Sequence, residues 1–217
     1  IAKIEKPEAL KNIDEIIKVS SGLMVARGDL GVELQSSEIP LIQKKLVAKA
    51  KKSRIPVIIA TQMMESMMES VTPSRAEVND VANSVMDGAD AVMLSGETSV
   101  GKFPKEVIKT MSSIINKVEN SNLISLANKR PKDQKSKRYI TKSICFSAAK
   151  MANDIKAKAI STLTNSGYTA FQISSWRPST HVLVFTSNRR ILTQLNLLWG
   201  VKAFFYDGFE STDITVE

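Results

Sequence analysis

Residues 23–31 read LMVARGDLG, a short apolar run that leads into a polar turn with two glycines. Two further apolar runs begin at residues 57 and 91, so the three runs begin 34 residues apart. Each run is followed by polar residues and then by a stretch in which apolar side chains recur at helical spacing. This pattern predicts a repeating βα unit, and in parallel α/β folds the reactive side chains lie at the carboxyl ends of the strands.

The chain has 217 residues and a formal net charge of +8, and its length fits one or two domains. Six of the eight net charges come from residues 129–142, where seven Lys or Arg residues stand against Asp133. A polar basic run with no aromatic residue before Tyr139 is typical of a solvated linker, with binding of an anion or a partner as the alternative. The charges of the remaining chain are nearly balanced, so we expect no nucleic-acid partner.

No apolar run approaches the ~20 residues that a membrane-spanning helix needs, so we expect no membrane partner. Cys145 is the only cysteine, and its apolar helical context predicts a buried structural thiol. A cytoplasmic location fits a chain that cannot form an internal disulfide. The sequence begins at Ile1 without an initiator methionine, which predicts a processed or truncated amino end.

The apolar patterns predict a first α/β part over 1–122, a basic linker over 123–139 and a second, incomplete α/β part over 140–217. The expected strands cover residues 1–5, 22–26, 57–60 and 91–94, then 157–163, 180–186 and 201–206. The expected helices cover residues 7–19, 39–53, 72–87 and 104–120, then 140–156, 168–175 and 190–198. Thr72 is predicted to cap the helix near 72–87, and Gly88 is predicted to end it in a left-handed conformation.

Lys3 and Glu5 are two residues apart on an expected strand, so their side chains point to the same face. A Glu in such a position can bind a divalent metal, and the Lys can stabilise charge that develops on a transferring group. A surface ion pair on an edge strand is the alternative. Asp29 follows the next strand and is a candidate second metal ligand, with a helix cap as its alternative.

Three more segments place polar groups at the same predicted edge. The glycines around Gly28 expose backbone N–H groups that can hold a carboxylate or a phosphate. Thr61 can orient a substrate or relay a proton, with a helix cap as the alternative. Ser95 and Glu97 are expected to support the site. The methionines of residues 63–68 are expected to pack in the core.

These segments and their neighbours resemble the pyruvate kinase family. The matching motifs are AKIEKPEAL at 2–10, MVARGDLGVE at 24–33, IATQMMESM at 59–67, SRAEVNDVAN at 74–83, DGAD at 87–90 and MLSGET at 93–98. They occur in the order and spacing of that family, and together they are very specific. Residues 140–217 resemble the family's carboxyl-terminal domain more loosely, through TNSGYT at 164–169 and WRP at 176–178.

The resemblance implies an α/β fold: the second half of a (β/α)₈ TIM barrel, followed by a smaller three-layer α/β domain. It implies transfer of phosphate from phosphoenolpyruvate to ADP with Mg²⁺ or Mn²⁺, and K⁺ whose ligands lie outside this chain. Glu5 and Asp29 would then ligate the divalent ion, and the backbone of Gly28 and Asp29 would hold the substrate carboxylate. Lys3 would stabilise the phosphoryl transfer and the enolate, and Thr61 would contact the substrate and help to protonate the enolate.

The resemblance also implies a homotetramer, in which Arg75 belongs to a helix that meets a neighbouring subunit. In some members a sugar-phosphate effector binds a loop that corresponds to residues 164–169. The residues of a possible effector phosphate loop are Thr164, Asn165, Ser166, Gly167 and Thr169. Family members that bind this effector have basic residues where Asn165 and Tyr168 stand here, so only a smaller phosphate is expected to fit.

Two rival functions remain open from the sequence. A metal-dependent aldolase or lyase on a similar barrel would also act on enolates of the pyruvate type. A non-catalytic chain would serve oligomerisation or effector binding without turnover. Four strands also leave open sheet edges, so we expect the isolated chain to be inactive and to aggregate or to pair half-barrel to half-barrel.

Overall fold

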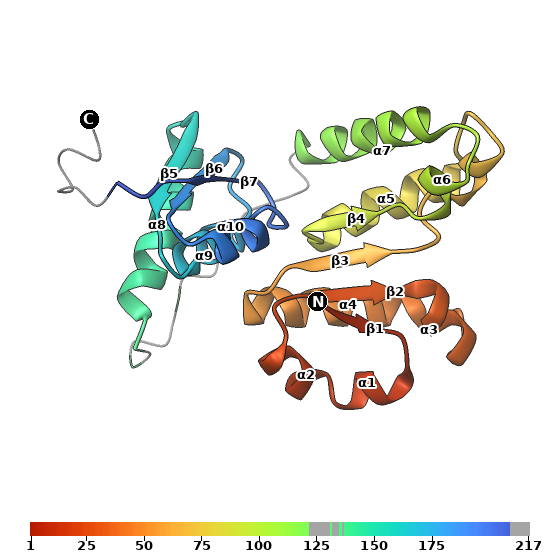
Figure 1. Cartoon of the computed structure of the whole chain (residues 1–217), viewed down its shortest axis with the longest axis horizontal. Helices are drawn as coiled ribbons and strands as arrows, with labels where there is room; N and C mark the ends of the chain where they lie inside the picture. Colours follow the sequence, from red (N-terminus) through yellow and green to blue (C-terminus); the bar gives the residue numbers. More distant parts are fainter. Residues whose placement is uncertain (122–130, 132–134, 136, 209–217) are drawn as a thin grey trace. The chain divides into compact units, whose positions relative to one another are not determined.

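The computed structural model describes residues 1–121, 131, 135 and 137–208. The chain divides into two compact units, Ile1–Ser125 and Leu126–Glu217, each of which is described by itself (Figure 1). The predicted basic linker over 123–139 lies largely outside the described residues. None of the helices in the described ranges is long and apolar enough to span a bilayer.

Unit 1 is built on four parallel strands in the order β1-β2-β3-β4. They are β1 (Ala2–Ile4), β2 (Leu23–Ala26), β3 (Val57–Ala60) and β4 (Ala91–Met93). Leu23 pairs with Val57 and Ala26 with Ala60, which confirms the spacing of 34 residues between the second and third strands. Each strand lies beside the next one along the chain, as in one half of a (β/α)₈ barrel.

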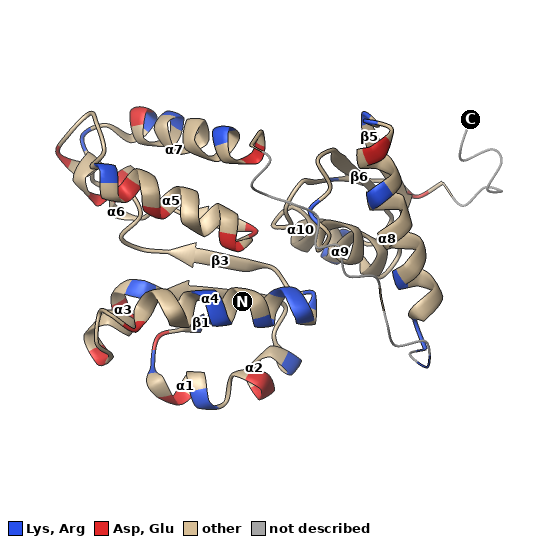
Figure 2. Ribbon diagram, turned by 180° about the vertical axis from the view of Figure 1, so that it is seen from behind, with Lys and Arg blue, Asp and Glu red and all other residues tan. Residues whose placement is uncertain are grey.

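Eight helical segments follow these strands in unit 1. They are α1 (Pro7–Lys11), α2 (Ile13–Val19), α3 (Arg27–Glu33), α4 (Ile39–Ser53), η1 (Glu65–Met68), α5 (Arg75–Asp87), α6 (Gly96–Ser99) and α7 (Pro104–Glu119). The prediction of one continuous helix over residues 7–19 is wrong, because the chain ends α1 and starts α2 around Asn12. Figure 2 shows both charge signs on α7, consistent with the balanced charge predicted outside the basic tract.

The core of unit 1 joins the strands to their helices. Buried strand residues such as Ile4, Val25 and Ile59 pack with Leu46 of α4 and Val81 of α5 in one apolar cluster. The predicted packing role of the methionines is confirmed, since Met63, Met64 and Met67 are fully buried. Burial of these side chains supplies the main driving force for closing the sheet against its helices.

The start of α5 differs from the prediction. Ser74, not Thr72, is the N-cap, and it forms a capping box with Glu77. In this arrangement each side chain accepts a hydrogen bond from the other's backbone N–H, which satisfies two groups that the first turn leaves open. The predicted left-handed end is confirmed, because Gly88 closes the helix with φ 98°.

Unit 2 has a second parallel sheet in the order β5-β6-β7. Its strands are β5 (Ala159–Leu163), β6 (His181–Thr186) and β7 (Val201–Phe205), and its helices are α8 (Tyr139–Asp154), α9 (Tyr168–Ser174) and α10 (Arg189–Leu195). Val182 and Val184 of β6 are fully buried in its core. Cys145 belongs to the same cluster, which confirms the predicted buried thiol.

Candidate functional site

The predicted site residues of unit 1 follow the ends of neighbouring strands. Glu5 follows β1, Gly28 and Asp29 follow β2 within the first turn of α3, and Thr61 follows β3. The strands are parallel and paired in sequence order, so their carboxyl ends meet at one edge of the sheet. The topology therefore gathers these residues at the edge where parallel α/β folds carry their chemistry.

Lys3 and Glu5 lie on the same face of β1, as the sequence predicts. The Lys3 ammonium and the Glu5 carboxylate are 2.5 Å apart, and their side chains are 58% and 35% exposed. The hydrogen bond and the charge of Glu5 raise the pKa of Lys3, and the charge of Asp29 raises it further. Lys3 therefore stays cationic within the field of both predicted metal ligands. An exposed ion pair of this kind stabilises a fold by little.

Thr61 has a backbone conformation that is rare for its residue type. Both Thr61 and Gln62 are left-handed, with φ of 69° and 54°. A β-branched residue in this region is a steric outlier that costs about 1–3 kcal/mol and is characteristic of functional sites. The Thr61 hydroxyl donates to the Ala60 carbonyl at 2.6 Å and accepts from the Gly28 N–H at 2.8 Å. This conformation links the ends of β2 and β3 through one side chain.

The helix-cap alternatives for Thr61 and Asp29 are wrong. The helices after β3 have Met64 and Ser74 at their N-caps, so Thr61 caps neither. Asp29 lies in the first turn of α3, whose N-cap is Ala26 without a side-chain bond. The Thr61 hydroxyl instead accepts from the Gly28 N–H in the first turn of α3.

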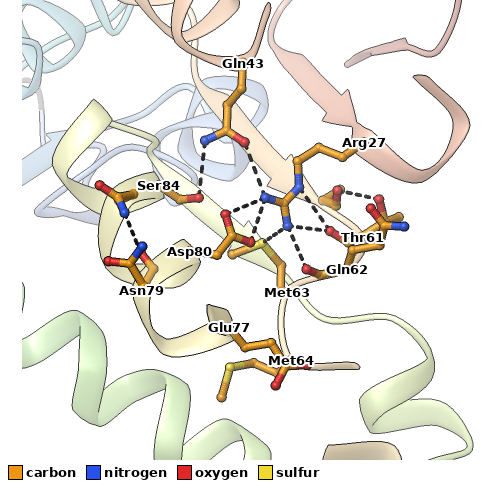
Figure 3. Close-up of polar contacts among 12 residues, drawn as sticks. Arg27, Gln43, Thr61, Gln62, Met63, Met64, Glu77, Asn79, Asp80 and Ser84 are labelled. Carbon is orange, nitrogen blue, oxygen red and sulfur yellow. Dashed lines mark hydrogen bonds and ion pairs between the residues drawn. The ribbon is translucent and has the colours of Figure 1, made fainter. Parts of the chain in front are cut away.

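Arg27 is a buried charged residue to which the sequence analysis assigned no role. It is 7% exposed, and its Nη2 donates to the carbonyl oxygens of Thr61 at 2.7 Å and Gln62 at 2.9 Å. Its Nη1 lies 2.7 Å from the Asp80 carboxylate and 3.4 Å from Gln43 Oε1. Figure 3 shows these side chains converging on the guanidinium from α4, α5 and the loop after β3. We call Arg27, Gln43, Thr61, Gln62 and Asp80 the Arg27 network.

One signal in the sequence pointed to Arg27. It follows β2 directly, and a cation that continues a buried strand needs partners that compensate for its lost hydration. Those partners stand 16 to 53 residues away along the chain, beyond the reach of any local pattern.

A pocket of about 400 Å³ beside the Arg27 network is lined by Arg27, Gly28, Gln62 and Asp80, among others. Gly28 is the one predicted site residue in this lining, which includes neither Lys3 nor Thr61.

Two acidic side chains hold the loop after β3 in place. Glu77 accepts from the Ser66 N–H at 2.7 Å and from the Ser66 hydroxyl. Partial burial acts to raise the pKa of Glu77, but hydrogen bonds from Ser66 and Ser74 outweigh it and keep that pKa below its ordinary value. Glu97 is 4% exposed and accepts from the N–H groups of Ser95 at 2.7 Å and Met64 at 3.4 Å. Glu97 therefore anchors the loop after β3, and the support of the reaction site by Ser95 and Glu97 stays a prediction.

The donor set of the predicted metal site suits Mg²⁺, which prefers carboxylate oxygens with water completing its shell. Glu5 and Asp29 are both acidic, partly or fully open to solvent, and within the field of Lys3. No group of three or more His, Cys, Asp or Glu side chains in the described ranges could form a metal site. A site of two carboxylates plus water is below that number, so the metal role of Glu5 and Asp29 stays a prediction.

The predicted interface and effector residues occupy exposed or loop positions. Arg75 is the first residue of α5 and is exposed. In unit 2, the Thr164 hydroxyl accepts from the Gly167 N–H at 3.0 Å, and Gly167 has φ 76°. A pocket of about 340 Å³ is lined by Thr164 and Asn165, together with Asp207 and residues that follow β6, but not by Ser166, Gly167 or Thr169.

Comparison with known proteins identifies what these two units are. The family model described as "Pyruvate kinase, barrel domain" matches residues 1–108, and "Pyruvate kinase, alpha/beta domain" matches residues 142–217. The chain belongs to the pyruvate kinase family. The resemblance seen in the sequence is thereby confirmed, and so is the α/β fold with half of a barrel followed by a smaller α/β domain.

Individual relatives agree with the family models. "Pyruvate kinase 2" of Synechocystis sp. is 43% identical over 217 residues, covering 100% of this chain and 36% of the relative. A pyruvate kinase of Corynebacterium glutamicum is 44% identical over 213 residues, which cover 98% of this chain and 44% of the relative. The crystal structure of a pyruvate kinase from Cryptosporidium parvum superposes with a TM-score of 0.86 at 36% identity. The match covers 99% of this chain and 43% of that structure's chain. The chain thus spans less than half the length of these members of the pyruvate kinase family.

Proposed function

We propose that this chain carries one part of a site that transfers phosphate from phosphoenolpyruvate to ADP. The observation that supports it best is the placement of Lys3, Glu5, Gly28, Asp29 and Thr61 at the carboxyl edge of one sheet. A cation next to two carboxylates and a positioned hydroxyl is the set that phosphoryl transfer to and from an enolate requires. In such reactions catalysis consists of positioning and of stabilising the charge of the transferred group.

Each residue has the role that membership of the pyruvate kinase family implies and that its chemistry allows. The ammonium of Lys3 stabilises negative charge on the transferring phosphoryl oxygens and on the enolate oxygen left behind. Thr61 orients the substrate, and its hydroxyl takes part in delivering a proton to the enolate carbon, which completes pyruvate. The backbone of Gly28 and Asp29 holds the substrate carboxylate. Glu5 and Asp29 hold Mg²⁺ or Mn²⁺, which neutralises phosphate charge when bound.

Further features are proposed from family membership. The family barrel has eight strands and this chain supplies four, so K⁺ ligands and most nucleotide contacts would come from other segments. A homotetramer would place Arg75 at a subunit contact. A cytoplasmic setting suits a chain with one cysteine. Residues 164–169 would at most bind a small phosphate, because the pocket beside them has no Lys or Arg in its described lining.

A coupled assay of ATP formation from phosphoenolpyruvate and ADP tests the proposal. It compares the 217-residue chain with a hybrid in which this chain is joined to the segments of the Corynebacterium glutamicum relative that it does not match. We expect no turnover from the chain alone, because open sheet edges leave the barrel unclosed, and clear turnover from the hybrid. A folded hybrid without turnover would contradict the proposal and favour the non-catalytic alternative. Aldol cleavage by the hybrid would favour the lyase.

A further inference from the structure

The loop after β3 holds two consecutive left-handed residues that are not glycine. Thr61 and Gln62 have φ of 69° and 54°, and neither residue type adopts this conformation without support from its surroundings. The direction of the Thr61 Cα–Cβ bond depends on that φ. The position of the Thr61 hydroxyl is therefore determined by whatever keeps the two residues left-handed.

We propose that Arg27 is a positioning residue that holds the Thr61 hydroxyl where the reaction needs it. The inference rests on the proposed function for the identity of the reaction. The guanidinium binds the Thr61 carbonyl oxygen through Nη2 at 2.7 Å and Nε at 3.2 Å, and Nη2 also binds the Gln62 carbonyl oxygen. The next residue, Gly28, donates its N–H to the Thr61 hydroxyl. Two consecutive residues thus hold Thr61 at both its carbonyl and its hydroxyl.

The chemistry of the contact requires arginine. All three guanidinium nitrogens are used: Nε and Nη2 on the loop carbonyls, and Nη1 on the Asp80 carboxylate. A planar fork can bridge two carbonyls and a carboxylate at fixed angles, whereas a lysine ammonium is a point charge on a flexible stem. Arg27 is 7% exposed, so water does not compete strongly for these donors.

The far side of the guanidinium is anchored to two helices. Asp80 of α5 forms the ion pair, and Gln43 of α4 accepts from Nη1 at 3.4 Å. The Gln43 amide in turn donates to Ser84 and Asp87 of α5 at 3.5 Å and 3.4 Å. Arg27 therefore connects α4 and α5 to the loop that carries Thr61 (Figure 3).

A positioning role and a purely structural role differ in what a substitution changes. A structural arginine lowers stability when it is lost and leaves the folded site unaltered. A positioning arginine alters the conformation of Thr61 in molecules that are still folded. Arg177 of unit 2 provides the matched control, because it is equally buried at 6% exposure and donates to the Ser174 carbonyl.

The first experiment uses the hybrid described above, labelled with ¹³C and ¹⁵N on threonine and glycine. In Arg27→Met and Arg27→Lys we expect the NMR chemical shifts of Thr61 Cα and Cβ to move away from the values typical of a left-handed backbone. We also expect the Gly28 amide to exchange at least about tenfold faster, because its acceptor is released. Arg177→Met should change neither signal. If Arg27→Met fails to fold, Arg27→Lys still decides, since it keeps a charge beside Asp80. A left-handed Thr61 in either folded variant would overturn the inference.

The second experiment measures kcat and KM in the hybrid described above. We expect Arg27→Lys to lower kcat about 100-fold, as misplacement of a reacting group by ~1 Å does, with far less change in KM. Unchanged kcat in that variant would overturn the inference even if stability fell. If the unsubstituted hybrid has no turnover, the proposed function fails, whereas the shifts of Thr61 still decide whether Arg27 positions it.

Discussion

The two parallel sheets of this chain end in loops of opposite character. At the carboxyl edge of unit 1, Lys3 stands within the field of Glu5 and Asp29, and a buried guanidinium holds the neighbouring loop. The pocket at the corresponding edge of unit 2 has Asp207 but no Lys or Arg in its described lining, and its loops are held by neutral groups such as Thr164 and Asn188.

This difference shows that a shared architecture does not determine the chemistry. A parallel sheet offers a binding edge in both units. Lys3 forms an ion pair with Glu5 at the edge of unit 1, whereas Arg189 at the edge of unit 2 stacks on the ring of Phe205. Phosphate chemistry needs such fixed charges. The comparison therefore supports unit 1 as the location of the proposed reaction.

Removal of the Lys3 charge would test the comparison most directly. In the hybrid enzyme, Lys3→Met should lower kcat by about 10²–10³, the usual loss when one electrostatic contact to the transition state is removed. Binding of phosphoenolpyruvate should weaken much less. Steady-state kinetics checks this, with Lys45→Met on the exposed side of α4 as the control. Near-normal turnover in Lys3→Met would remove the residue from the mechanism.

Glu97 offers the largest expected effect on stability. Glu97→Gln replaces an acceptor for two backbone N–H groups with an amide that can accept only one of them. A buried donor without its acceptor costs about 1–3 kcal/mol, so the free energy of unfolding should fall by that amount. Urea titration measures it, and Glu33→Gln on the exposed part of α3 is the control. Equal stability in the two variants would count against the supporting role of Glu97.

The pH dependence of unit 1 should include a contribution from Glu77. The folded-state pKa of Glu77 lies below its ordinary value of 4.5, so its charged form stabilises the fold above that pH. This contribution is lost as the pH falls through the folded-state pKa. The free energy of unfolding should therefore depend less on pH in Glu77→Gln, between about pH 5 and pH 2. If the free energy of unfolding changes with pH by the same slope in Glu77→Gln and in the control Glu65→Gln, the Glu77 carboxylate does not contribute to this pH dependence.

In unit 2, the smallest expected effect is on the rate at which a reagent modifies the thiol of Cys145. Burial raises its pKa, which lowers the fraction of reactive thiolate at neutral pH. We expect a disulfide reagent to modify the native chain at least about tenfold more slowly than the chain in denaturant. Absorbance of the released thiol follows the reaction, and rapid modification of the native chain would show that unit 2 opens readily.

The sequence predicted β2 and β3 well, because strands buried on both faces are apolar throughout and end in polar turns. It predicted Lys3 and Glu5 on one face because side chains alternate along a strand. It missed the cap at Ser74, since Thr72, Pro73 and Ser74 all suit the start of a helix. It also missed Arg27, whose partners come from Gln43, the loop after β3 and α5. Such contacts depend on tertiary packing, which no local pattern reports.

The left-handed conformation of Thr61 also bears on how this loop changes over generations. Glycine or asparagine would adopt the same backbone with less strain, so selection for stability alone favours losing the threonine. Selection for its hydroxyl acts in the opposite direction. A descendant of this chain that no longer needed the reaction would be free to drift to glycine at this position. Its backbone would gain stability while the Gly28 N–H lost its hydrogen-bond acceptor. Glycine at this position would therefore indicate that selection for the threonine hydroxyl had ended.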